Sequence, residues 1–300
     1  MGDRYSRAPM RIGLAGGGTD IAPFYQDYGG CSLTVTIKKY AYASFNGSPD
    51  NSLFASTIKK HLGYRGEIST RKDAENLSGL GGSAAFAVAV IGLLSMGRMS
   101  KQAVAEMAMD VERNKLSVAG GVQDFWASSI GGFNYFEYNS DGVNVLPMLR
   151  TSFVDKLENS LLLFFTTKRD LDGSGVQDDV IMRMNEGQNI EALLNIKENC
   201  NESRRAIRKE RLHEFGEILD AAWSEKKKLS KFISNEKLDE LYESCKQQGA
   251  IAGKLMGAGG GGYMLLLCSD INKCANYLTS KNYNPERVSF DWDGLVVGDL

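Results

Sequence analysis

The sequence is poor in the residues that build zinc sites. It has only two histidines, His61 and His213, and its five cysteines are odd in number and form no CxxC pair. A zinc site of histidine and cysteine ligands is therefore not expected, and any catalytic metal should be bound by oxygen atoms. The unpaired cysteine spacings and the lack of a signal peptide predict a protein of the reducing cytoplasm.

Long apolar runs and an excess of one charge are also missing. Apolar runs such as 161–165 and 263–268 are far shorter than the ~20 residues that span a bilayer. The 35 basic and 37 acidic residues give a net charge of -2, so the chain has no field that would attract nucleic acid or an anionic membrane. We expect neither partner. A small anionic substrate stays possible, because its site needs only a few cations.

The chain has the composition of a folded protein with one large or two medium domains, since 43% of its 300 residues are apolar and 24% are charged. Its first half is rich in glycine and alternates apolar with polar residues. This alternation predicts strands at 10–15, 33–37 and 40–45, the last two forming a hairpin around Lys38 and Lys39.

The second half is richer in charged helical segments. A strand is predicted at 161–166, helices across about 176–248, and a further strand at 263–268. The fold class is therefore α+β, and the change of pattern predicts a boundary near residue 150 between domains 1–150 and 151–300.

The centre of the first half carries a glycine-rich loop that runs into a helix of small residues, Gly79-Leu80-Gly81-Gly82-Ser83-Ala84-Ala85. Glycines allow N–H groups to converge on an anion, and the first helical turn adds donors at the positive end of the helix dipole. The segment can bind phosphate, or it can be a tight loop before a packed helix. A dinucleotide site is disfavoured because 71–78 is too polar for the preceding buried strand.

A second glycine run, 257–262, contains the spacing GxGxxG but leads into a strand, where a nicotinamide site requires a helix. No GxxxxGK[ST] motif is present, which excludes a Walker-type nucleotide site. Nearer the N-terminus, the segment 8–20 couples Arg11 on a strand to a glycine turn and Asp20. Arg11 can pair with an anion, and Asp20 can accept hydroxyl protons of a polyol or cap the next helix.

Taken in order, the three motifs PMRIGLAGGGTD, GLGGSAA and KLMGAGGGG resemble those of the GHMP small-molecule kinases, the superfamily of galactokinase, homoserine kinase and mevalonate kinase. The stretches GGVQD at 120–124 and GGFN at 131–134 look most like bacterial heptose kinases. The resemblance implies a two-domain fold of antiparallel and mixed sheets with helices. Its N-terminal half would be ribosomal-protein-S5-domain-2-like and its C-terminal half ferredoxin-like.

By this resemblance, Asp124 matches the general base of the family, and Arg11 lies beside it and stabilises negative charge. Ser83 and Glu112 match the magnesium ligands. The ATP phosphates would be bound by the central loop, residues Gly79, Leu80, Gly81, Gly82, Ser83 and Ala84. The run 257–262 is expected to support this loop.

The sugar would be bound by the N-terminal turn, residues Gly17, Gly18, Thr19 and Asp20. Gly17 and Gly18 replace bulkier residues of galactokinase, so a roomier pocket is expected there. Lys168 and Arg169 follow a buried strand and are candidates for binding a distal substrate phosphate, with Lys38 and Lys39 as competitors. For either pair, a solvated loop charge is the alternative.

The resemblance implies an ATP- and magnesium-dependent kinase that phosphorylates the anomeric hydroxyl of D-glycero-D-manno-heptose 7-phosphate. Two alternatives stay open. The acceptor can be an unphosphorylated hexose or another polyol, or the chain can be a regulator that binds sugar and nucleotide without turnover. The last is suggested by Gly82, which stands where the family loop usually has a serine. The sequence does not determine the oligomeric state, and a homodimer is one of the open alternatives.

Overall fold

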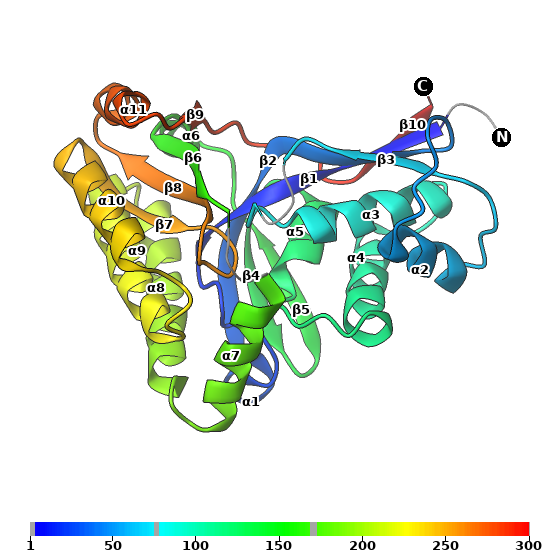
Figure 1. The fold of residues 1–300 in the computed structure, drawn as a ribbon. Helices are drawn as coiled ribbons and strands as arrows, with labels where there is room; N and C mark the ends of the chain where they lie inside the picture. The colour runs from blue at the N-terminus through cyan, green and yellow to red at the C-terminus, as the bar shows by residue number, and fades with distance from the viewer. Residues whose placement is uncertain (1–3, 75–77, 169–172, 300) are drawn as a thin grey trace.

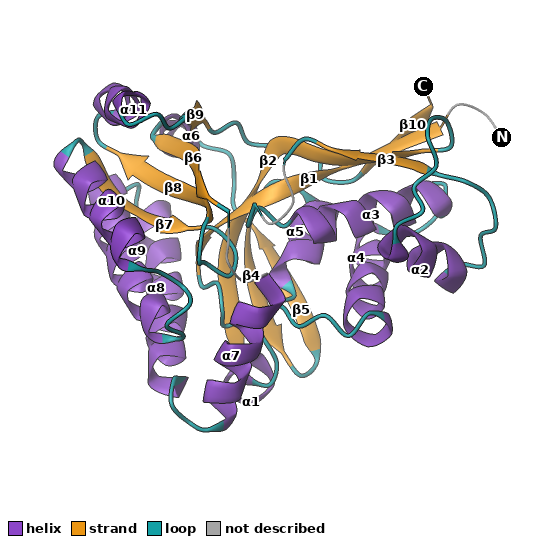
Figure 2. Cartoon of the chain, viewed as in Figure 1, coloured by secondary structure: helices purple, strands orange, loops and turns teal. Residues whose placement is uncertain are grey.

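The computed structural model describes residues 4–74, 78–168 and 173–299. Two antiparallel sheets with helices packed against them form the molecule (Figure 1, Figure 2). This arrangement confirms the predicted α+β class. No helix within the described ranges is both long and apolar enough to cross a membrane.

The first sheet has the strand order β10-β1-β2-β4-β5, with β3 paired to β2. Its strands are β1 (Arg4–Ala15), β2 (Gly30–Ser44), β3 (Ser69–Lys72), β4 (Phe133–Asn139), β5 (Gly142–Pro147) and β10 (Val296–Asp299). Strand β10 comes from the C-terminal end of the chain and pairs with β1. The split at residue 150 stays a prediction, and this strand from beyond residue 290 is part of the N-terminal sheet.

One face of the first sheet is covered by helices α2 to α5 (Figure 1). They are α2 (Leu53–His61), α3 (Gly82–Leu94), α4 (Lys101–Asp110), which continues as a π-helical turn η1 (Val111–Lys115), and α5 (Gln123–Ile130), while the short α1 (Phe24–Tyr28) follows β1. Helix α3 packs on β1 and β2, and every residue from Ala84 to Leu93 is buried. Because α3 is apolar on all sides, it forms the centre of the core and fixes the loop at its start.

The second sheet has the order β7-β8-β6-β9. Its strands are β6 (Leu161–Thr167), β7 (Ala250–Leu255), β8 (Gly262–Cys268) and β9 (Glu286–Arg287). The helices of this half are α6 (Ser152–Asn159), α7 (Gly173–Asn185), α8 (Ile190–Arg208), α9 (Leu212–Lys228), α10 (Glu236–Gln247) and α11 (Ile271–Ser280). Helix α8 also contacts β1 and β2, so the two halves share a continuous core.

The hairpin predicted around Lys38 and Lys39 is wrong. Strand β2 runs through both residues without turning, and its pairing with β1 shifts between Pro9, opposite Tyr40, and Met10, opposite Ile37. The two lysines are therefore the extra residues of a β-bulge. Alternation of apolar and polar residues is the same on both sides of a bulge and of a turn, which explains the error.

Candidate active site

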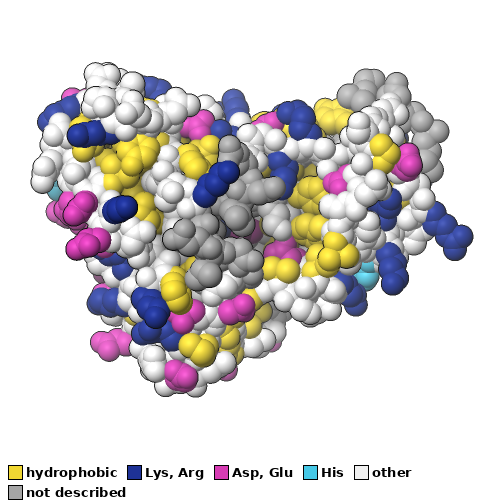
Figure 3. Space-filling model, in the orientation of Figure 1, with side chains coloured by type: hydrophobic (Ala, Val, Ile, Leu, Met, Phe, Trp, Pro, Cys, Tyr) yellow, Lys and Arg dark blue, Asp and Glu magenta, His cyan; other side chains and the backbone are white. Residues whose placement is uncertain are grey.

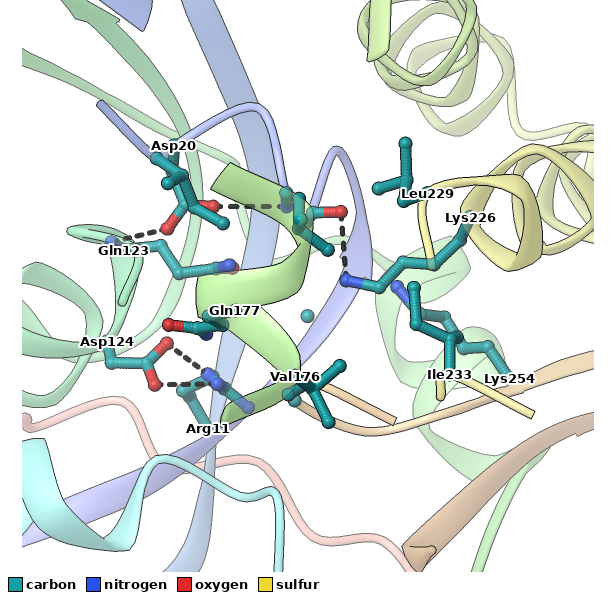
Figure 4. Close-up of a pocket in the computed structure, with 18 residues that line it drawn as sticks. Arg11, Asp20, Gln123, Asp124, Val176, Gln177, Lys226, Leu229, Ile233 and Lys254 are labelled. Atoms are coloured by element: carbon teal, nitrogen blue, oxygen red, sulfur yellow. Dashed lines mark hydrogen bonds and ion pairs between the residues drawn. The ribbon is translucent and has the colours of Figure 1, made fainter. Parts of the chain in front are cut away.

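Two adjoining cavities open where the first sheet, helix α3 and the second sheet meet. The larger holds about 620 Å³ and is lined by the central glycine loop, Glu112 and the aromatic rings of Phe54 and Phe86. The smaller is lined by the N-terminal turn and by residues of α7, α9 and β7 (Figure 4). Arg11 and Asp124 belong to the wall of both cavities.

On the face seen in Figure 3, basic and acidic side chains are interspersed, as the balanced composition predicts.

Arg11 and Asp124 form a bidentate ion pair at the junction of the cavities (Figure 4). Nε and Nη2 of Arg11 each donate to one carboxylate oxygen of Asp124 at 2.6 Å, and Nη1 donates to the Gly79 carbonyl at 2.6 Å. Arg11 lies on β1 and is only 4% exposed, and its backbone amide donates to the Leu80 carbonyl at 2.9 Å. A single buried guanidinium thus joins the carboxylate to the glycine loop and fixes the position of both.

The glycine loop turns into helix α3 with its backbone facing the larger cavity. Gly79 and Gly81 have φ of 84° and 74°, in the left-handed region that glycine adopts without steric cost. The first hydrogen bond of α3 runs from the Ala85 amide to the Gly81 carbonyl, which leaves the amides of residues 82–84 outside the hydrogen bonds of the helix itself. Such a helix start binds anions.

Not every residue predicted for the loop reaches the cavity. Gly79 and residues 81–84 line it, whereas the Leu80 side chain is fully buried in the core. Tyr263, which follows the 257–262 run, donates its amide at 3.0 Å to the carbonyl of Ser78, which precedes the loop. Support of the loop by the run itself stays a prediction. Gly257 and Ala258 also line both cavities, a position that the sequence did not predict.

Ser83 and Glu112 come together at the larger cavity, with Ser83 Oγ donating to Glu112 Oε2 at 2.7 Å. Glu112 lies in the π-helical turn η1 that extends α4, and Ser100 caps α4, its side chain accepting from the Ala103 amide. Burial raises the pKa of the Glu112 carboxyl, the charge of Asp124 adds to the rise, and the Ser83 hydrogen bond opposes it. The pair therefore presents two adjacent oxygen atoms to the cavity.

Asp20 lines the smaller cavity and is 1% exposed. Its two carboxylate oxygens accept from the amides of Gly18 and Gln123, each at 3.1 Å. Asp20 therefore caps α5, the helix that carries Asp124, and not the helix α1 that follows it in sequence. The expected capping of the following helix is therefore wrong, since α1 has no side-chain cap, and the Asp20 carboxylate keeps lone pairs for a hydroxyl.

Of the other residues predicted to bind the sugar, two line the smaller cavity and one does not. Gly17 and Gly18 line the smaller cavity. The Thr19 hydroxyl is buried within hydrogen-bond distance of the backbone of Gly16 and Cys31, so it holds the turn together and does not reach the cavity.

Of the two pairs of cations predicted to bind the distal phosphate, none of the described residues lines either cavity. Lys168 is exposed and is not part of either cavity wall, and Arg169 lies outside the described residues. Lys38 is exposed in the bulge, and Lys39 forms a 2.9 Å ion pair with Glu286.

Two buried lysines that the sequence did not predict as site residues line the smaller cavity. Lys226, at the end of α9, and Lys254, in β7, are 9% and 8% exposed. Burial, together with the positive charges of Lys226 and Arg11, lowers the pKa of Lys254 to about 7. Lys254 stands in an otherwise apolar strand segment, AIAGKL, and this was the available signal. The position of Lys226 within a run of three lysines gave none.

Comparison with known proteins identifies the family. Residues 52–132 match the GHMP kinases N terminal domain, and residues 203–284 match the GHMP kinases C terminal domain. The chain belongs to the GHMP kinase family. Members of this family are phosphotransferases that use ATP as the phosphate donor.

Several relatives of this GHMP kinase are known. It is 28% identical to the D-glycero-alpha-D-manno-heptose 7-phosphate kinase of Campylobacter jejuni, over 89% of this chain and 90% of that protein. A mevalonate kinase of Pyrococcus horikoshii is 27% identical, over 81% of this chain and 68% of its own. The crystal structure of a D-glycero-D-manno-heptose 1-phosphate kinase from Bacteroides thetaiotaomicron superimposes with a TM-score of 0.78 and 26% identity, covering 99% of both chains.

The departure of this GHMP kinase at Gly82 does not distort the loop. Gly82 begins α3 without a positive φ, and a Cβ placed on it would meet only the Met10 methyl group, at 3.6 Å. At Gly81, by contrast, φ is 74° and a Cβ would lie 3.3 Å from both the Arg11 side chain and the Asp124 carboxylate. The serine that the family usually has at position 82 would therefore fit.

We predict opposite effects for substitutions at these two neighbouring glycines. Gly82→Ser should raise the free energy of unfolding by about 0.5 kcal/mol, because serine is the better helix former. Gly81→Ala should lower it by roughly 1–2 kcal/mol through left-handed strain, and should also displace Asp124 and reduce turnover. Urea unfolding and ADP release measure both. Equal losses of turnover in the two variants would contradict the prediction that only position 81 requires glycine.

Proposed function

We propose that this GHMP kinase transfers the γ-phosphoryl group of ATP to the anomeric hydroxyl of D-glycero-D-manno-heptose 7-phosphate, giving the 1,7-bisphosphate. The observation that supports it most is the position of Asp124. This carboxylate is on the wall shared by the two cavities and is held by Arg11, which also binds the glycine loop. A hydroxyl in the smaller cavity and a phosphate at the loop would meet at Asp124.

In this mechanism Asp124 is the general base. The acceptor oxygen forms a bond to the γ-phosphorus while the bond from that phosphorus to the β,γ-bridging oxygen breaks, and ADP leaves with the electron pair. The hydroxyl proton passes to Asp124. Arg11 keeps the carboxylate oriented and places positive charge beside the transferring group, where negative charge accumulates.

The residues of the larger cavity fit ATP with magnesium. Magnesium prefers oxygen ligands, keeps several waters, and is often held by one or two carboxylates together with substrate phosphates. The adjacent oxygens of Ser83 and Glu112 match this donor set, and the described residues contain no group of three or more histidine, cysteine or acidic side chains that would form a separate metal site. When bound, magnesium neutralises charge on the β- and γ-phosphates. Loop amides of residues 82–84 would bind the phosphate oxygens directly.

The smaller cavity is the acceptor side in this proposal. Asp20 would accept a hydrogen bond from a sugar hydroxyl, and the absence of side chains at Gly17 and Gly18 leaves room for the ring. The free volume of about 50 Å³ is well below the ~300 Å³ of usual ligand pockets. We therefore expect the wall formed by Val176 and Val180 of α7 to move outward when the acceptor binds.

The choice of a phosphorylated heptose is supported by the named relatives. Both the Campylobacter protein and the Bacteroides structure are described as kinases of a heptose phosphate, although the descriptions differ in the position of the phosphate. The Pyrococcus horikoshii mevalonate kinase is also related in sequence, but the match covers only 68% of its own length. The chain resembles the heptose kinases over nearly its whole length, which favours a heptose phosphate as acceptor.

An acceptor screen tests the proposal. ADP release would be measured with heptose 7-phosphate, the free heptose, free hexoses and mevalonate, each with ATP and magnesium, and the product position would be assigned by phosphorus NMR. We expect the highest kcat/KM for heptose 7-phosphate and a new phosphate on C1. A higher kcat/KM for a free hexose would favour the second acceptor class. Ligand binding without ADP release in the whole series would favour a silent regulator.

A further inference from the structure

The smaller cavity contains a cluster of nitrogen donors on the side away from the nucleotide loop. We propose that Lys226, Lys254 and Gln123 form a subsite for a phosphate monoester carried by the acceptor, at a distance from the hydroxyl that reacts. This inference rests on the proposed function, and it gives the distal phosphate a binding site other than the predicted Lys168 and Arg169.

The donors converge on one point. A Cβ added to Gly17 would lie 3.6 Å from Gln123 Nε2, 3.8 Å from Lys226 Nζ and 4.0 Å from Lys254 Nζ. That point holds no side chain, because residue 17 is glycine. Figure 4 shows both lysine side chains extending into the pocket across from Gln123. Two cations and an amide around one empty position are suited to a tetrahedral dianion.

The donors are held in place by the fold. Lys226 Nζ donates to the Gly17 carbonyl at 3.1 Å, and the Thr34 hydroxyl donates to Gln123 Oε1 at 3.1 Å, which turns the Gln123 NH₂ group toward the cavity. Within residues 4–74, 78–168 and 173–299, no hydrogen bond or ion pair forms on the Lys254 ammonium. A buried ammonium without a protein partner is costly unless a ligand supplies one.

The subsite is separate from the ATP phosphates. Lys226 and Lys254 line only the smaller cavity, whereas the glycine loop, Ser83 and Glu112 line only the larger one. Arg11 and Asp124 lie between them. An acceptor bound by its phosphate at the lysines can therefore extend its far end toward Asp124. This geometry selects acceptors with a phosphate remote from the reacting hydroxyl.

Anion binding should also change the protonation of Lys254. The charged and titratable groups that face it are Lys226 from α9, Arg11 from β1, Asp20 from the N-terminal turn and Cys200 from α8. Burial and the two neighbouring cations lower the pKa of Lys254 to about 7. A bound dianion raises it again, so at pH 8 phosphate binding should be accompanied by proton uptake.

The first test compares KM values for heptose 7-phosphate and the free heptose. Lys254→Gln should raise the KM of the phosphorylated sugar roughly 10- to 100-fold more than that of the free sugar, the usual effect of losing a charge-assisted hydrogen bond. Lys254→Arg should recover part of the loss. Lys228→Gln is the matched control, because Lys228 is two residues from Lys226 but is exposed and pairs with Glu225. Equal KM increases for both sugars in Lys254→Gln would overturn the subsite.

The second test is independent of the acceptor's identity. Inorganic phosphate is titrated calorimetrically at pH 8, in buffers of different ionisation enthalpy, into enzyme saturated with magnesium and a non-hydrolysable ATP analogue. We expect binding with proton uptake in the wild type, and loss of both in Lys254→Gln and Lys226→Gln. Unchanged binding in both variants would overturn the subsite. If the wild type prefers another phosphorylated acceptor but the titration behaves as expected, the heptose assignment fails and the subsite stands.

Discussion

Replacement of Asp124 by asparagine is expected to reduce kcat by roughly 10²- to 10⁴-fold, the usual contribution of a general base. Asparagine has almost the same shape, and its Oδ1 can still accept one of the two hydrogen bonds from Arg11, so the wall between the cavities should persist. The amide cannot take the hydroxyl proton. The loss should therefore fall on kcat, whereas the affinity for ATP, which is bound at the loop, should change little.

The measurement has to separate catalysis from folding. Removing the negative charge leaves the buried Arg11 guanidinium without a counter-ion, close to the charge of Lys254, so some loss of stability is also expected. Thermal unfolding and ATP binding are therefore measured beside ADP release. Asp155→Asn is the matched control, because Asp155 pairs with Arg150 at 3.0 Å on the surface. An Asp124→Asn enzyme that folds, binds ATP and keeps near-full turnover would show that the ion pair is structural.

The parts of this site that the sequence could predict are those encoded in short segments. The glycine loop, the strand with Arg11 and the turn with Asp20 each contain their chemistry within a dozen residues. The structure brings Arg11, Ser83, Glu112 and Asp124 to one cavity wall, as the ordered motifs predicted. Glycine turns and helix starts are local features, so their geometry follows from sequence without knowledge of the fold.

The parts that could not be predicted depend on contacts between distant segments. Lys226 and Lys254 become buried cations only because α9 and β7 pack beside the N-terminal turn. The pairing of β10 with β1 in the first sheet also cannot be predicted from a local sequence pattern. For the bulge at Lys38 and Lys39, one signal was available, since a two-residue hairpin turn favours glycine, asparagine or aspartate and this pair has none of them.

Substitution of Glu112 by glutamine is expected to raise the magnesium concentration needed for half-maximal activity by at least roughly tenfold and to lower kcat. A glutamine oxygen can still accept the Ser83 hydrogen bond, but it lacks the negative charge that attracts the ion. The position of Glu112 in a π-helical turn supports this reading, because such turns frequently occur at functional sites. Its partly buried carboxyl faces a phosphate-binding loop, where an anion without a bound cation would repel ATP.

Magnesium titrations of ADP release, made at saturating ATP and acceptor, check this expectation. Glu106→Gln is the control, since Glu106 is an exposed residue of α4 that precedes Glu112 in the chain and lies outside both cavities. Ser83→Ala should shift the magnesium requirement in the same direction as Glu112→Gln, and the double variant should show less than the sum of the two effects, because both residues would act on one ion. If Glu112→Gln and Glu106→Gln have the same magnesium dependence, Glu112 is an ordinary helix residue and the metal must be held by the loop and the phosphates alone.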